Sequence, residues 1–527
     1  MGWRSWPGSS IPNCSSSGGA ACLEFKGVIL SDVKSSLRRG LGARHLSMIS
    51  IGGVIGVGMF LGSGETVRLG GPGVVLSYLL GGVVMMIIML ALAEMSVAYP
   101  VPGSFRVYAS RYLGPFFGFV TGWVYWLSWV GIMAAEIVAA TLYMEYWFPG
   151  APNWVFGALF ALLMTVTNLM SVRFFGEFEF WFSLMKLVAI VAFILVGIAA
   201  VLGLGARFGV PRIGTSNYLG RGGFFPNGLR GVSLAMVMVM LAYGGTEVIG
   251  IAAAETRNPE RNVPLAMKGV LVRTLVLYVG SVAVLVGVMP WTEAGLTGSP
   301  FVKVFSLMGL RWSAALMNVV VITAALSSMN SGLYTSSRML HSLSLQGMAP
   351  EVFSRVSGRT GVPYSAVLAS TASLYLGVLA YYLSPHGAFL FIAGISAFGF
   401  FFSWMVIVLS HIRFRPAVEA TEPERLKFRA PGFPYLSILA AVVMAVVTAS
   451  LWFIPEQRIG LLAGLTVMGA VSIWYAAARI AQRGVPRFAL RPAEAMRLSL
   501  YFGLDSATRD GPEDREPSHG DLKHRGE

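Results

Sequence analysis

Long apolar segments separated by short polar loops dominate this chain. Each segment has close to the ~20 residues that a helix needs to cross the hydrocarbon core of a bilayer. The pattern predicts an all-α protein that crosses a membrane about twelve times. The expected spans are residues 46–65, 73–99, 116–146, 154–171, 180–203, 231–253, 268–289, 312–341, 364–383, 387–411, 435–454 and 459–480.

The first span is rich in glycine. It runs LSMISIGGVIGVGMFLGSG from Leu46 to Gly64 and carries six glycines. A glycine inside a helix costs about 1 kcal/mol relative to alanine. In lipid, a broken backbone is tolerated only where it faces protein or a water-filled cavity. We therefore predict that this helix is interrupted near Gly56-Val57-Gly58, and that a ligand binds to the freed backbone groups.

A second interruption is expected five spans later. The sixth span reads LAMVMVMLAYGGTEVIGIAAAE, in which Gly244-Gly245 precedes Thr246 and Glu247. Two broken helices at matching places in two five-helix halves are typical of an inverted repeat. The spacing therefore suggests a five-plus-five repeat with broken helices 1 and 6, followed by two C-terminal helices.

Composition and charge agree with a membrane protein. The chain has 527 residues, of which 55% are hydrophobic and 12% charged, a balance unlike that of soluble globular proteins. Its net charge of +14 does not indicate nucleic acid, because the basic residues lie between spans. With both termini in the cytoplasm, 30 lysines and arginines fall on the inner side and eight on the outer side, with Lys186 inside a span. This asymmetry follows the positive-inside rule, although four arginines in one outer loop oppose it.

The two ends of the chain differ from its centre. Residues 1–40 are rich in glycine and serine, and residues 481–527 are highly charged, so we expect both to be disordered cytoplasmic tails around a transmembrane domain at 41–480. Only two cysteines are present, both in the first tail, which excludes a disulfide framework.

Four ionisable residues fall inside predicted spans, where a charge costs at least ~2.5–3.5 kcal/mol and is a functional candidate by default. Glu94 has an alternative as a structural partner of the basic inner loops. The alternative interpretation of Lys186 is a lysine that extends to the membrane interface. The alternative interpretation of Glu136 is a structural hydrogen-bonding group. Glu247 follows the second glycine pair and is expected in or beside the site.

The first break offers polarity of two kinds. The free N–H groups that begin the outer half-helix suit a carboxylate, and the carbonyls that end the inner half-helices suit an ammonium group. An α-amino acid carries both charges on one carbon, and so fits a site made of two opposed helix ends. The alternative is that the glycines only allow close helix packing, as small residues do in membranes.

Several long motifs in order now give the chain a resemblance to a known family. The motifs are GARHLSMISIGGVIGVGMFLGSG (42–64), GGPGVVLSYLL…LALAEMSVAYPVPGSF (70–105), GFVTGWVYW (118–126), FGEFEFWFSLMK (175–186), YGGTEVIGIAAAETRNPERNVP (243–264), SGLYTSSRML (331–340) and FRAPGFPY (428–435). With these motifs, the chain resembles bacterial amino acid permeases, the amino acid transporter family of the amino acid–polyamine–organocation superfamily, from about Leu41 to Arg479.

The resemblance implies a secondary active transporter of the cytoplasmic membrane that imports an α-amino acid by proton symport with alternating access. It implies a site near the membrane midplane, no cofactor, and a proton gradient as the driving force. Backbone amides of Gly56-Val57-Gly58 would bind the substrate carboxylate, and carbonyls near Val54 and Leu241–Gly244 would bind the amino group. Tyr243 would be an aromatic neighbour, and Lys186 would stand where sodium-coupled relatives bind sodium.

These inferences give one candidate set. Many relatives have Ser or Thr where this chain has Val57, so a side-chain hydroxyl to the carboxylate is lost here. The expected substrate-binding residues are Val54, Gly56, Val57, Gly58, Glu136, Leu241, Tyr243, Gly244, Gly245, Thr246 and Glu247, with Lys186 for proton coupling.

Other functions remain as alternatives. An amino acid exchanger of the same fold is one. A polyamine or organic-cation transporter is another, but it calls for more acidic residues than Glu136 and Glu247. A membrane-embedded enzyme is disfavoured, because none of the six histidines stands in an HExxH motif and no nucleophile elbow with a partner is present. A channel would favour a continuous polar stripe.

Overall fold

The computed structural model describes residues 37, 39–204, 212–294, 299–307, 311–383 and 385–481. The two tails predicted at 1–40 and 481–527 lie almost entirely outside these residues, so their predicted disorder stays a prediction. The helices are α2 (Ala43–Val54), α3 (Val57–Phe60), α4 (Gly62–Gly70), α5 (Val74–Ala98), α6 (Phe105–Tyr112), α7 (Pro115–Met144), α8 (Asn153–Leu169), α9 (Val172–Leu202), α10 (Ser216–Leu219), α11 (Gly228–Ala242), α12 (Val248–Ala252), α13 (Pro259–Val288), α14 (Pro300–Leu307), α15 (Arg311–Leu345), α16 (Tyr364–Leu383), α17 (Pro385–Thr421), α18 (Tyr435–Ser450) and α19 (Pro455–Ala481).

The predicted all-α membrane fold is confirmed. Each predicted span coincides with a helix, or with two or three successive helices where a break was expected. In the described part of the chain, eight helices are long and apolar enough to cross a membrane, and α8 and α11 are shorter apolar helices. Extended structure within the same residues is limited to an isolated bridge between Leu41 and Thr256.

The helices differ in how far they are buried. In the 18-residue apolar segment of α15, 83% of the residues are buried, whereas in that of α9 only 28% are buried. Large apolar side chains of α9, among them Trp181 and Leu195, are exposed on its outer face. Its polar residues Glu179 and Lys186 are fully buried on the opposite face. An exposed apolar face backed by a buried polar one indicates that α9 faces lipid outward and a polar interior inward.

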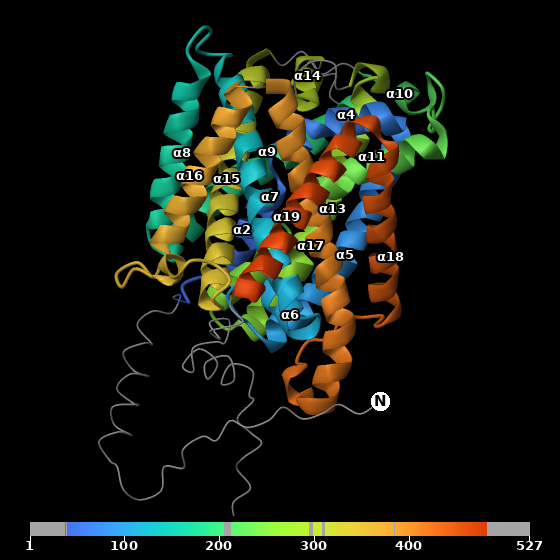
Figure 1. The fold of residues 1–527 in the computed structure, drawn as a ribbon. Coiled ribbons are helices and arrows are strands. Elements are labelled where there is room, and N and C mark those ends of the chain that lie inside the picture. The colour runs from blue at the N-terminus through green and yellow to red at the C-terminus, as the bar shows by residue number, and fades with distance from the viewer. Residues whose placement is uncertain are drawn as a thin grey trace, which may run out of the picture.

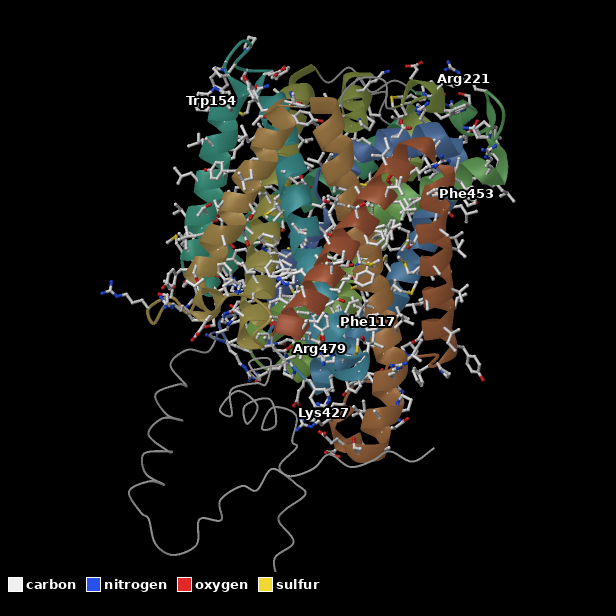
Figure 2. The ribbon with its side chains drawn as sticks, in the orientation of Figure 1. Phe117, Trp154, Arg221, Lys427, Phe453 and Arg479 are labelled. Carbon is white, nitrogen blue, oxygen red and sulfur yellow. The ribbon has the colours of Figure 1, made fainter. Side chains whose placement is uncertain are left out.

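The bundle has two distinct ends (Figures 1 and 2). One carries α6 and the labelled Lys427 and Arg479, and we call it the basic end. The opposite end carries α10, α14 and the labelled Trp154 and Arg221. These positions give the predicted orientation a structural reference.

Buried ion pairs tie helices together near the basic end. Glu255, just beyond α12, accepts a hydrogen bond of 2.9 Å from Nε of Arg338 in α15. Glu94 of α5 is bound by Arg415 and by His411, both from α17, and by the backbone N–H of Ala430. Glu94 is therefore a structural partner of basic groups, which is the alternative that its position near the inner loops had suggested.

Candidate functional site

The first predicted break is present. Helix α2 ends at Val54, and α3 begins at Val57 after an extended Gly56. The carbonyls of Gly52 and Ile55 are turned toward Lys186 Nζ, at 2.9 and 2.8 Å. Because these carbonyls accept bonds from a side chain, the break presents its oxygens to a cation.

The second break lies against the first. Helix α11 ends at Ala242 and α12 begins at Val248. Between them Gly245 has a φ of +96°, which favours glycine, and a Cβ atom there would lie 2.4 Å from the carbonyl oxygen of Gly53. Gly245 is therefore required both for its backbone conformation and for contact between the two interrupted helices.

A cavity of about 140 Å³ lies between the two breaks. Six of the predicted residues line it, namely Val54, Gly56, Gly58, Glu136, Leu241 and Gly244. Apolar side chains that the sequence did not single out complete much of the wall, among them Trp129, Ile132, Met238 and Phe400. Such residues resemble any others in apolar spans, so only their position around the cavity identifies them.

Glu136 occupies the first break directly. Its carboxylate oxygens accept the backbone N–H of Val57 at 3.2 and 3.1 Å, and the side chain is buried. A Cβ on Gly56 would lie 2.2 Å from Glu136 Oε1, so this glycine makes room for the carboxylate. The carboxylate of Glu136 therefore binds a backbone N–H group that the resemblance assigned to the substrate carboxylate.

The other five predicted binding residues do not appear in the cavity wall. The hydroxyl of Tyr243 donates to the carbonyl of Tyr78 at 2.8 Å, and that of Thr246 donates to the carbonyl of Tyr243 at 3.1 Å. The side chains of both residues thus hold other backbone groups. Val57, Gly245 and Glu247 also lie beside the cavity, outside its lining.

Glu247 holds the second break. Its carboxylate accepts bonds from Tyr125 at 2.7 Å, from Trp404 at 3.2 Å and from the N–H of Gly245 at 3.1 Å. Every one of these partners is a donor, and the side chain is fully buried. This arrangement fixes the backbone at Gly245. Glu247 was expected either in the site or beside it, and its side chain lies beside the cavity.

Lys186 does not extend to the membrane interface. The ammonium group of Lys186 donates to Ser327 Oγ at 3.0 Å, in addition to the carbonyls of Gly52 and Ile55. A second charged residue, Glu179, lies on the same helix and is bonded to Ser327 and Asn330. Sequence reasoning missed Glu179 because the predicted span began one residue later. Its position seven residues before Lys186, which places both on one helix face, was the available signal.

Tyr278 joins the two breaks and was also not predicted. Its hydroxyl lies 2.9 Å from the carbonyl oxygen of Val54 and 3.1 Å from that of Ala242. These carbonyls lie at the C-terminal ends of α2 and α11, two places where carbonyls were expected to bind an amino group. A hydroxyl at this point keeps both oxygens aligned beside the cavity.

The comparisons with known proteins decide the family. The amino acid permease family model matches residues 45–479. Two Bacillus subtilis proteins are each 42% identical: an uncharacterized amino acid permease over 82% of this chain and 93% of its own length, and a gamma-aminobutyric acid permease over 85% and 94%. An amino-acid permease of the same organism is 40% identical over 83% and 94%. The chain belongs to the amino acid permease family.

Family membership makes the chain a multi-pass membrane protein related to transporters. Its relatives are named permeases, which points away from catalysis. In the described residues no group of three or more His, Cys, Asp or Glu side chains is placed to hold a metal ion.

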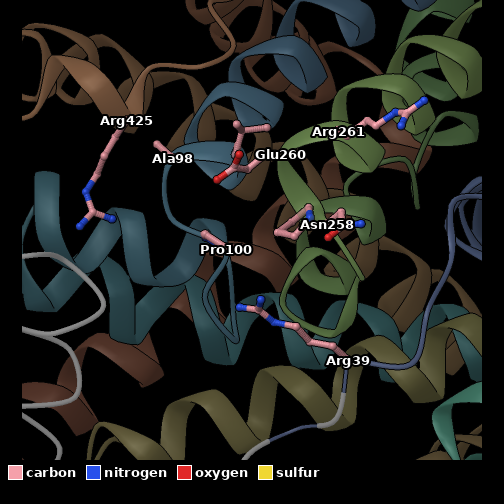
Figure 3. Close-up of a pocket in the computed structure, with 9 residues that line it drawn as sticks. Arg39, Ala98, Pro100, Asn258, Glu260, Arg261 and Arg425 are labelled. Carbon is pink, nitrogen blue, oxygen red and sulfur yellow. The ribbon is translucent and has the colours of Figure 1, made fainter.

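A larger groove of about 880 Å³ lies at the basic end of the permease (Figure 3). Its wall includes Arg39, Arg261, Arg425 and Glu260, and the last of these is paired with Lys427 at 2.7 Å. None of the predicted site residues belongs to it. The smaller cavity between the breaks is therefore the better candidate for the substrate.

Proposed function

We propose that this amino acid permease imports a zwitterionic α-amino acid by proton symport, with the basic end in the cytoplasm. The observation that carries the proposal is the pairing of broken-helix ends with buried charge. Lys186 is bound by two carbonyls of the first break, and Glu136 is bound to the amide that follows it. A substrate that changes either contact therefore acts on a titratable group.

The cavity suits a small solute. A water-sized group needs ~10–15 Å³ of cavity volume. The cavity of about 140 Å³ therefore has room for about ten non-hydrogen atoms. Its charged lining is a single carboxylate, Glu136, and the rest is glycine, hydroxyl and apolar groups. This composition favours an amino acid with a modest side chain over a polyamine, which would call for several carboxylates.

Lys186 is the proposed coupling residue. Its ammonium is fully buried and holds the carbonyls of Gly52 and Ile55 together through one charged group. Loss of the proton leaves an amine with one donor fewer and no charge, which weakens its hold on both oxygens. Alternating exposure of the site would thereby link protonation of Lys186 to the geometry of α2 and α3.

Uptake into proteoliposomes tests the proposal. Each common amino acid and one polyamine would be offered as labelled substrate, with and without an acid-outside pH gradient. We expect accumulation of at least one amino acid that depends on the gradient. Lys186→Ala should abolish accumulation but keep exchange of labelled for unlabelled substrate, whereas Lys427→Ala, which removes an exposed lysine at the basic end, should behave as wild type. Exchange without gradient-driven accumulation by the wild type would make the protein an exchanger.

A further inference from the structure

A buried carboxylate lies two helical turns from Lys186 on the same face of α9. Glu179 is fully buried, as is Lys186, and the side chains of both contact α2 and α15. A single hydroxyl, that of Ser327 in α15, connects the two. It accepts a hydrogen bond of 3.0 Å from Lys186 Nζ and donates to Glu179 Oε1 in close contact.

The orientation of the neighbouring amide defines the role of Glu179 as an acceptor. Asn330 Oδ1 accepts bonds from Thr167 at 2.9 Å and from Asn168 at 2.7 Å. The NH₂ group of Asn330 must therefore point to Glu179 Oε2, 2.8 Å away. Asn330 and Ser327 therefore both donate to Glu179, whose two oxygens act as acceptors.

Gly52 serves both charged residues. Its carbonyl accepts the bond from Lys186, and a Cβ at this position would lie 1.8 Å from Glu179 Oε1. The absence of a side chain lets the carboxylate pack against α2. The glycine pair Gly52-Gly53 thus makes room for Glu179 on one side and meets Gly245 on the other.

We propose that Glu179 receives the proton that leaves Lys186, with Ser327 as the relay between them. This inference rests on the proton symport proposed above. The proton on Lys186 Nζ passes to Ser327 Oγ as the hydroxyl proton of Ser327 passes to Glu179 Oε1. An ammonium and a carboxylate become a neutral amine and a neutral carboxylic acid, and the hydroxyl is restored. Net charge is unchanged, and no separated charge is left in a low-dielectric region.

A histidine–carboxylate pair lies on the basic-end side of Glu179. One turn before Glu179, the ring of His45 packs against Gly176, and its Nε2 lies 2.9 Å from Glu177 Oε1. Glu177 is partly exposed, whereas the His45 side chain is almost fully buried.

Other titratable groups around the relay come from the neighbouring helices. Arg44 of α2 binds Glu177, Glu136 of α7 lies against Gly56, and Tyr278 of α13 binds the carbonyl of Val54. Helices α15 and α8 contribute hydroxyl and amide groups to the relay itself. Glu179 is the carboxylate bonded to the hydroxyl that Lys186 contacts, which is why the proton is assigned to it.

Two variants test the relay. Glu179→Gln removes the titrating group, and Ser327→Ala breaks the connection while keeping Glu179. In proteoliposomes containing a pH-sensitive dye, we expect both to lower substrate-linked proton entry and gradient-driven accumulation by about tenfold or more. Exchange at equal pH and stabilisation by substrate against thermal unfolding should stay within about twofold of wild type.

Two further variants supply the controls. Ser327→Thr keeps the hydroxyl and should retain proton entry. Glu260→Gln makes the same charge change at an exposed carboxylate and should behave as wild type. Proton-driven accumulation by Glu179→Gln at the wild-type level overturns the relay, and so does a parallel loss of exchange and thermal stability, which shows a structural role. If Lys186→Ala loses coupling while Glu179→Gln keeps it, symport stands and only the relay fails. If the wild type shows no proton entry, both proposals fall.

Discussion

Glu136 binds the amide that begins the outer half of the first broken helix: its Oε2 lies 3.1 Å from the backbone nitrogen of Val57. The same N–H was expected to bind a substrate carboxylate. Two carboxylates cannot share one N–H group without strong repulsion in a buried site. Binding of a substrate carboxylate at this amide would therefore require Glu136 to turn away, and under the proposed function its carboxylate would then meet the substrate's ammonium group in the cavity.

The first prediction concerns this exchange of partners. Glu136→Gln keeps the size of the side chain but removes the charge that would meet the ammonium group. We expect substrate affinity, measured by competition in exchange assays, to weaken by about tenfold, or ~1.4 kcal/mol. Glu145→Gln, at the exposed end of the same helix, is the matched control. Unchanged affinity of Glu136→Gln would mean that Glu136 only caps α3.

The second prediction concerns Glu247, whose three partners all donate to it. In Glu247→Gln, the NH₂ group of the new amide would face one of these donors. We expect a loss of about 1–3 kcal/mol in stability, the cost of an unsatisfied buried polar group, together with impaired transport. Thermal unfolding in detergent measures the loss. Tyr125→Phe, which removes one donor, should cost less, and a fully stable Glu247→Gln would show that the charge is not needed.

The third prediction concerns the contact between the two breaks. Gly245→Ala places a methyl group against the carbonyl of Gly53 at a positive φ. We expect it to lower thermal stability and abolish transport, because either the backbone conformation or the contact must change. Gly469→Ala, at a helical position with open space around it, should be neutral. Wild-type transport by Gly245→Ala would contradict the close approach.

The fourth prediction concerns orientation. Arg221 and Lys427 are exposed at opposite ends of the bundle (Figure 2). In a background lacking Cys14 and Cys22, Arg221→Cys should react with an impermeant maleimide in intact cells. Lys427→Cys should react only after permeabilisation, because the proposed orientation has the basic end in the cytoplasm. The reverse labelling pattern would invert the direction of the proposed transport.

Local features of the sequence determined the spans and the two breaks. Hydropathy sets which segments cross a bilayer, and glycine weakens a helix wherever it occurs, so neither depends on which helices are neighbours. For this reason the interruptions at Gly56 and at Gly244-Gly245 were predicted within a few residues. A buried role for Lys186 followed in the same way, because a charge within an apolar span needs a partner.

Only the tertiary structure decided which side chains meet at the site. Spans such as α7 are apolar along almost their whole length, so the sequence does not specify how each of these helices is rotated about its axis. That rotation brings Glu136 to Val57, points Glu247 to Tyr125 and Trp404 beside the cavity, and places Glu179 on Ser327. Tyr278 reaches the C-terminal ends of α2 and α11 for the same reason. The sequence supplied the broken backbone and the buried charges, and helix packing determined the partner of each.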